Sequence, residues 1–100
     1  GCMTRLVLAA ELAEDVERIV AHLPAHDAAH IDERVAEVFD ALAILRDHPL
    51  IGRPSMQGRR DLVIGRDARG HVARCQYDAV DDGVAVLALR AQREAGFVDR

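Results

Sequence analysis

The feature that most constrains the fold is a change of apolar periodicity near residue 48. Before it, apolar residues recur at helical spacing, and after it they form short runs typical of strands. The first helical stripe consists of Leu12, Val16, Ile19, Val20 and Leu23. The second consists of Ile31, Val35, Val38, Leu42 and Leu45. Pro24 ends the first helix and His48-Pro49 closes the second, and the short link between them predicts an antiparallel helical hairpin.

The second half of the chain predicts a three-stranded antiparallel meander. Its strands are expected at residues 60–65, 71–80 and 84–91, with a short turn at 66–69 and a tight turn at Asp82-Gly83. An apolar run at residues 4–9 predicts a further, N-terminal strand. Because a sheet must bury one face, we expect both helices to cover one side of it. The sequence therefore predicts a single α+β domain over residues 3–100.

The sequence offers little support for a metal-binding site or for a catalytic nucleophile. Three histidines are spaced four apart: His22, His26 and His30. Pro24 separates the first two, so one helix cannot present all three as ligands. Ser55 is the only serine, and two acid pairs are predicted on polar helix faces: Glu14-Asp15 and Asp32-Glu33. We expect neither a metal nor a cofactor.

The cysteines and the lengths of the apolar runs indicate in which cellular compartment the protein is expected. Cys2 and Cys75 are too few for a disulfide framework, and Cys75 is predicted to be a small core residue. No run approaches the roughly 18 apolar residues of a membrane span, and no signal peptide is visible. A cytoplasmic protein without membrane contact is expected.

The charges are unevenly placed along an acidic chain. The net charge is −4, and all thirteen basic residues are arginines. Between Arg53 and Arg74 there are six arginines but only two acids, Asp61 and Asp67. An acidic chain with three aromatic residues is unlike a general DNA-coating protein or a base-stacking module. The arginine-rich segment is therefore predicted to be a local basic patch.

Several of these arginines are candidates to converge on one face of the sheet: Arg59, Arg60, Arg74, Arg90 and Arg93. Arginine binds phosphate or carboxylate in a planar, bidentate way. Such a cluster could hold an RNA backbone and stabilise a transition-state phosphate, grip an acidic partner, or form ordinary salt bridges with the acidic helices. These interpretations stay open at this point.

The last predicted strand is apolar on both of its alternating faces. Residues 84–89 read VAVLAL, whereas a strand with one wetted face should alternate polar and apolar residues. One interpretation is a partner-binding surface that includes Val84 and Val86. The alternative is a central strand that tolerates small residues such as Ala85 and Ala88.

Three segments together carry a family resemblance. They are LAAELAEDVERI at 8–19, HPLIGRPSMQGRRDLVIG at 48–65 and HVARCQYDAVDDGVAVLALRAQREAGF at 71–97. In this order and spacing the chain resembles the RelE/ParE superfamily of toxins, also called plasmid stabilisation proteins, from bacterial type II toxin–antitoxin systems. The turn Gly52-Arg53-Pro54 before Arg60 matches the family's helix-to-sheet connection. The resemblance covers nearly the whole domain and implies the predicted fold.

The superfamily divides in function. RelE-like members are ribosome-dependent, metal-free mRNA endonucleases, and ParE-like members inhibit DNA gyrase. Here lysine is absent, Phe97 stands where many RelE-like members have tyrosine, and Ala91 stands where histidine is common. General acid–base catalysis needs a titratable group near the scissile bond, which Tyr77 or His71 would have to supply. The resemblance therefore favours the ParE-like side.

Two alternatives remain beside gyrase inhibition. One is an endoribonuclease with the catalytic candidates Arg59, Arg60, Arg74, Tyr77 and Arg93. The other is a non-toxic relative that retains only antitoxin binding. In all three cases the resemblance implies a cognate ParD-like antitoxin folding over the toxin's apolar and basic surface. The partner-binding candidates are Arg60, Arg74, Val84, Val86, Arg90 and Arg93.

Overall fold

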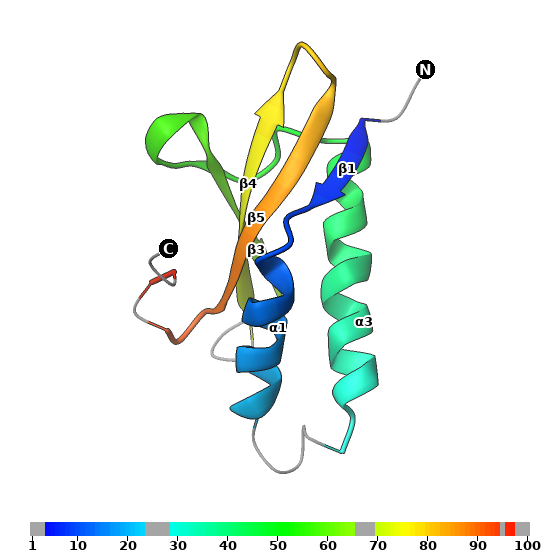
Figure 1. Ribbon diagram of the computed structural model, residues 1–100, viewed down its shortest axis with the longest axis vertical. Coiled ribbons are helices and arrows are strands. Elements are labelled where there is room, and N and C mark those ends of the chain that lie inside the picture. The colour runs from blue at the N-terminus through cyan, green and yellow to red at the C-terminus, as the bar shows by residue number, and fades with distance from the viewer. Residues whose placement is uncertain (1–3, 24–28, 66–69, 95, 98–100) are drawn as a thin grey trace.

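A computed structural model describes residues 4–23, 29–65, 70–94 and 96–97 of the 100-residue chain (Figure 1). The α-helices are α1 (Leu12–Ala21) and α3 (Ile31–Leu42), and short 3₁₀ helices follow at Ala43–Arg46 (η1) and Met56–Gly58 (η2). The strands are β1 (Arg5–Leu8), β2 (Arg53–Pro54), β3 (Arg60–Ile64), β4 (His71–Asp78) and β5 (Gly83–Ala91). The predicted α+β order of strand, helical hairpin and three-stranded meander is confirmed.

All five strands join one mixed sheet in the order β1-β5-β4-β3-β2. The meander β3-β4-β5 is antiparallel, as predicted, whereas β1 pairs with β5 in parallel. The connection that such a parallel pair requires contains the helical hairpin, which leads from β1 across the sheet, followed by β2, β3 and β4. The two-residue strand β2, within what the sequence presents as a loop, adds a short antiparallel edge to β3.

Both helices lie on one side of the sheet, where they pack antiparallel (Figure 1). α1 ends at Ala21, and Pro24, His26 and the turn at 66–69 lie outside the described residues. None of the helices in the described segments combines the length and apolar character of a membrane crossing.

The core lies between the helices and one face of the sheet. Its buried members are Leu12 of α1, Val38 and Leu42 of α3, Leu45 of η1, and the strand residues Leu62, Ile64, Ala73, Cys75, Val84, Val86 and Leu89. Cys75 is buried as predicted, and burial raises the pKa of its thiol to about 11. An aliphatic core of this kind is what a chain with three aromatic residues must build.

The placement of Val84 and Val86 corrects the partner-surface prediction. Both are fully buried, because strand alternation directs them under the helices. The second apolar set of β5 follows from a register shift: Cys75 pairs with Val86 but Arg74 pairs with Ala88, so Leu87 is an extra residue. Such a β-bulge offsets the alternation by one residue, so Leu89, rather than Ala88, rejoins the core face.

Candidate functional site

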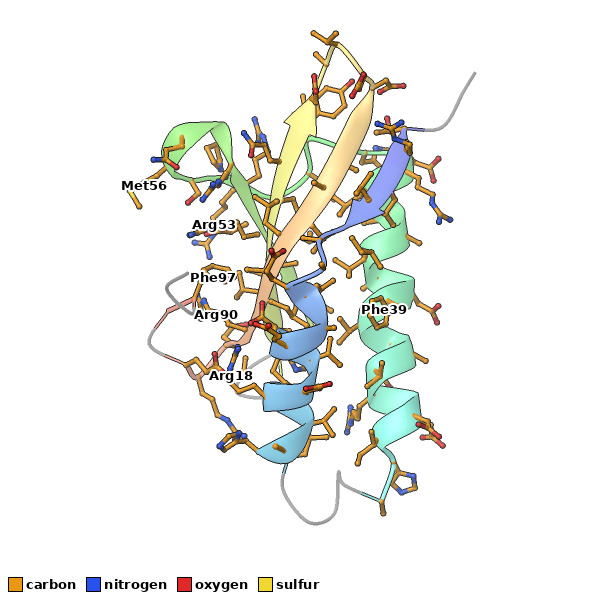
Figure 2. All side chains as sticks on the ribbon, viewed as in Figure 1. Arg18, Phe39, Arg53, Met56, Arg90 and Phe97 are labelled. Carbon is orange, nitrogen blue, oxygen red and sulfur yellow. The ribbon has the colours of Figure 1, made fainter. Side chains whose placement is uncertain are left out.

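The sheet face turned away from the helices carries four of the six second-half arginines in the described residues, and we call it the arginine face. Alternation places on it Asp61 and Val63 of β3, Val72, Arg74 and Gln76 of β4, and Ala85, Ala88 and Arg90 of β5. Arg53 pairs with Asp61 and therefore lies on the same side. Figure 2 shows Arg53, Arg90 and Phe97 on the side of the sheet opposite Phe39 of α3.

The loop between the helices and β3 brings further groups to this face. Gly52 has φ +107°, and a Cβ there would lie 2.8 Å from the Asp61 carbonyl oxygen, so the turn requires glycine. Ser55 N–H donates to the Arg59 carbonyl at 2.7 Å, which continues the β2–β3 ladder. The loop thus projects Met56, which is 75% exposed, beyond the edge of the sheet (Figure 2).

Four residues at the centre of the arginine face form a two-by-two block. Arg74 faces Ala88 across the β4–β5 pair, and Val72 faces Arg90 one step along. The two arginines therefore occupy one diagonal and the two aliphatic side chains the other. The Phe97 ring lies over both guanidinium groups, at 4.2 Å from Arg74 Cζ and 5.2 Å from Arg90 Cζ. Both distances are within the range of cation–π interactions.

The two arginines of the block have different polar partners. Arg74 Nε donates to Asp61 Oδ1 at 3.3 Å and Nη2 to Ser55 Oγ at 3.4 Å. Arg90 Nη1 donates to the carbonyl oxygens of Ala91, Gln92 and Glu94, at 3.2–3.4 Å. Within the described residues no carboxylate pairs with Arg90, and its buried Nε has no partner. Arg90 therefore retains a net positive charge on this face.

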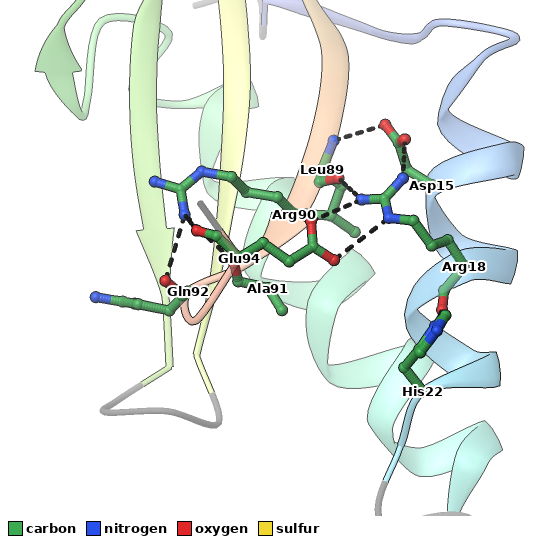
Figure 3. A network of polar contacts seen from close by, with 8 residues as sticks. All are labelled: Asp15, Arg18, His22, Leu89, Arg90, Ala91, Gln92 and Glu94. Atoms are coloured by element: carbon green, nitrogen blue, oxygen red, sulfur yellow. Dashed lines mark hydrogen bonds and ion pairs between the residues drawn. The ribbon is translucent and has the colours of Figure 1, made fainter. Parts of the chain in front are cut away.

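A second polar network ties α1 to the end of β5 (Figure 3). Asp15 is fully buried; its Oδ2 accepts from Leu89 N–H at 2.9 Å and its Oδ1 from Arg18 Nη1 at 2.7 Å. Arg18 also donates to the Leu89 carbonyl at 3.0 Å and pairs with Glu94 at 3.1 Å. Asp15 and Arg18 thus bind the backbone N–H and carbonyl of Leu89, at the part of β5 that extends beyond the end of β1. The ion pair of Arg18 with Glu94 also holds the turn that leads to Phe97.

The network favours the charged form of Arg18. Burial acts to lower its pKa, but hydrogen bonds and charge interactions with Asp15 and Glu94 outweigh burial, so the pKa is raised. The buried Asp15 corrects the prediction that the Glu14-Asp15 pair lies on a polar helix face. The overlooked signal is spacing, since Asp15 lies three residues after Leu12 and four before Ile19, on the apolar stripe.

The predicted catalytic candidates do not all meet. Arg59 lies on the arginine-face side, with its Nε buried and unpartnered among the described residues. Arg60 pairs with the core residue Cys75, so alternation directs it to the helix side, where Nη1 donates to the Gly52 carbonyl at 3.2 Å. Arg93 donates to the His22 carbonyl at 3.1 Å, at the end of α1. Convergence on one face is therefore wrong for Arg60 and Arg93.

Tyr77 and His71 also lie away from the block. Tyr77 alternates with Cys75 on the core side, near the β4–β5 turn, and its hydroxyl donates to Asp82 Oδ1 at 2.8 Å. This hydrogen bond raises the tyrosine pKa. His71 lines a small apolar cavity between the helices and the sheet. Burial lowers the His71 pKa, which favours the neutral form of the ring.

Comparison with known proteins decides the family. The family model for the ParE toxin of the type II toxin–antitoxin system parDE matches residues 6–96. The chain belongs to the ParE toxin family. No curated protein matched the chain.

A solved structure agrees with the fold of this ParE-type toxin. The chain is similar to one in the toxin–antitoxin complex RelBE2 from Mycobacterium tuberculosis, with a TM-score of 0.57 and 17% identity. The match covers 90% of the present chain and 99% of the other. At this identity the likeness concerns the fold alone.

One site residue of the ParE-type toxin was missed by sequence reasoning. Phe97 was noticed as a departure from the RelE-like pattern, but its place over Arg74 and Arg90 was not predicted. The available signal was its isolation, because it is the only aromatic residue after Tyr77 and follows an arginine-rich strand end. Aromatic rings and guanidinium groups attract one another when a chain folds back over a sheet.

Proposed function

We propose that this ParE-type toxin inhibits DNA gyrase and is neutralised by a cognate antitoxin. The observation that carries the proposal is the ParE family match along residues 6–96, nearly the full chain. The fold likeness to a chain of a toxin–antitoxin complex supports an antitoxin partner. The proposed mode of action is binding, with the arginine face as the contact surface for both proteins.

The arrangement of titratable groups supports inhibition by binding. Tyr77 and His71 are both on the helix side of the sheet, opposite Arg74, and Arg93 is held at the end of α1. A general acid or base must lie within hydrogen-bond reach of the proton that it transfers. On the arginine face, the strand carboxylates of the described residues are Asp61, which pairs with Arg74, and Asp78, which accepts from the Val80 and Asp81 N–H groups of the β4–β5 turn.

A second candidate function, endoribonuclease activity, has one observation in its favour. Arg59 and Arg90 each hold a buried Nε without a hydrogen-bond partner among the described residues. A phosphate oxygen would satisfy such a donor and would gain from the positive charge around it. In this alternative the arginine face would bind and polarise the RNA backbone.

Purified components separate the two candidates. We expect the toxin to block ATP-dependent supercoiling of relaxed plasmid by gyrase, and to leave an mRNA on translating ribosomes uncut in primer extension. Addition of the antitoxin, sought in the adjacent reading frame, should restore supercoiling. Codon-specific mRNA cleavage together with unaffected supercoiling would refute the proposal and support the nuclease. Activity in neither assay would favour a non-toxic relative.

A further inference from the structure

The centre of the arginine face is built like a receptor for one aromatic side chain. Arg74 and Arg90 stand on one diagonal of the block, and Val72 and Ala88 form an aliphatic floor on the other. Val72 is 5% exposed and Ala88 6%, although neither belongs to the core cluster under the helices. They are thus covered from the arginine-face side, where the Phe97 ring lies. We call these four residues the aromatic seat.

The present occupant of the seat is held through its side chain. The segment before it is anchored: Gln92 N–H donates to the Gly70 carbonyl at 2.9 Å, and Glu94 pairs with Arg18 at 3.1 Å. After Glu94, no backbone hydrogen bond joins Phe97 to another described residue. Among the described residues, the ring's identified contacts are the two guanidinium groups. Exchange of this ring for another would therefore break no backbone hydrogen bond between described residues.

The charge around the seat shows what kind of ring would replace it. Three arginines on this face have no carboxylate partner among the described residues: Arg53, Arg59 and Arg90. Arg74 has one carboxylate partner, Asp61, at 3.3 Å. On the other side of the sheet the described arginines divide: Arg18 and Arg34 are each paired with a carboxylate, whereas Arg60 and Arg93 donate to backbone carbonyls. The unmatched positive charge attracts carboxylates to the rim of an apolar seat.

We propose that the aromatic seat binds an acidic antitoxin segment that inserts its own aromatic side chain in place of Phe97. In the free toxin Phe97 is the placeholder, which shields Val72 and Ala88 from water. In the complex the partner's ring takes its position between Arg74 and Arg90, and flanking carboxylates pair with Arg90, Arg59 and Arg53. The inference rests on the proposed antitoxin partner and specifies how that partner is recognised.

A protein segment fits the seat better than a nucleic acid. The floor is aliphatic, so it matches a phenyl ring, whereas a nucleobase has polar edges that lose hydrogen bonds there. Aromatic residues and arginine are also the side chains that dominate protein–protein binding energy.

The test measures binding of a defined probe by fluorescence anisotropy. The probe is a fluorescein-labelled peptide, Glu-Glu-Phe-Glu-Glu, with Glu-Glu-Ala-Glu-Glu as its matched control. We expect the phenylalanine peptide to bind the toxin, and Phe97→Ala to tighten binding by about three- to tenfold because the placeholder is gone. The double variant R74Q/R90Q, which keeps hydrogen-bond donors but loses charge, should weaken binding at least tenfold. R5A/R46A removes two exposed charges elsewhere and should leave binding unchanged.

These binding measurements test the aromatic seat independently of gyrase inhibition. Equal or weaker peptide binding by Phe97→Ala, equal binding of the two peptides, or insensitivity to R74Q/R90Q would overturn the proposal. Tighter binding of a uridine octanucleotide than of the peptide, enhanced by Phe97→Ala, would replace it with RNA recognition. Circular dichroism verifies that each variant is folded. If the antitoxin itself binds unaltered toxin and R74Q/R90Q equally, the seat is wrong while neutralisation stands; if it binds neither, the proposed partner fails.

Discussion

The two faces of the sheet accommodate arginine in different ways. On the helix side, Arg18 meets the carboxylates of Asp15 and Glu94 and also the Leu89 carbonyl. On the arginine face, Arg90 meets three backbone carbonyls and the Phe97 ring, with no carboxylate among the described residues. Positive charge is neutralised at Arg18 and retained at Arg90. The difference indicates that the Arg18 network maintains the fold, and it is consistent with the recognition role proposed for Arg90.

The largest effect on stability is expected from the helix side. Asp15→Ala would leave the Leu89 N–H buried without an acceptor and deprive Arg18 of its closest carboxylate. We expect a loss of about 3 kcal/mol in the free energy of unfolding, measured by urea denaturation. Asp32→Ala, an exposed acid in the first turn of α3, is the control and should change it by under about 0.5 kcal/mol. Equal losses in the two variants would show that the Asp15 network does not maintain the fold.

A smaller loss is expected at the loop that borders the arginine face. Gly52→Ala places a Cβ 2.8 Å from the Asp61 carbonyl oxygen at φ +107°, and should cost about 2 kcal/mol. Gly58→Ala is a matched control, because φ there is +75° but nothing lies within 4 Å of the added atom. It should cost about 1 kcal/mol, the price of the left-handed backbone alone. A reversed order in thermal denaturation would contradict the close approach of this loop to β3.

A weaker, pH-dependent effect is expected at His71, on the helix side. Burial lowers its pKa; the charges of Arg34 and Arg93 act in the same direction, and Glu94 opposes them. The unfolded chain therefore takes up the proton first, so stability contributed by neutral His71 is complete above the ordinary pKa of 6.5 and declines as pH falls below it. His71→Gln should flatten the fall in melting temperature between about pH 7 and 5. His48→Gln, at an exposed site, should leave that fall in place.

The smallest effect is expected at Tyr77. Tyr77→Phe removes the hydrogen bond to Asp82 near the β4–β5 turn, at the end of the strands remote from the aromatic seat. Inhibition of gyrase should change by less than about twofold, because the hydroxyl takes no part in recognition. A drop of a hundredfold or more in growth inhibition, with the variant still folded, would instead assign Tyr77 a catalytic role.

Local pattern was sufficient to predict most of the fold. The two apolar stripes predicted α1 and α3, and the short apolar runs predicted β3, β4 and β5. The parallel pairing of β1 with β5 was not predicted, because it depends on how the helical hairpin crosses the sheet. β2 was also missed, since two residues are too few for a periodicity to be visible.

The candidate site was less predictable because it depends on the register between strands and on the path of the chain after β5. A shift of one residue moves a side chain to the other face, and this decides why Arg60 lies on the helix side while Arg59 does not. The bulge at Leu87 similarly brings Ala88 and Arg90 to the arginine face. Phe97 reaches Arg74 only because the chain folds back after β5, which no local pattern encodes.

The most direct test of the account is gyrase inhibition by R74Q/R90Q compared with R5A/R46A. Each variant loses two positive charges, the first pair from the aromatic seat and the second from exposed sites outside it: Arg5 on the edge strand β1 and Arg46 in η1. The account predicts that the concentration for half-inhibition of supercoiling rises at least tenfold for R74Q/R90Q and stays within about twofold for R5A/R46A. Equal inhibition by the two folded variants would contradict the assignment of recognition to the aromatic seat, and absence of inhibition by the unaltered toxin would contradict the proposed function.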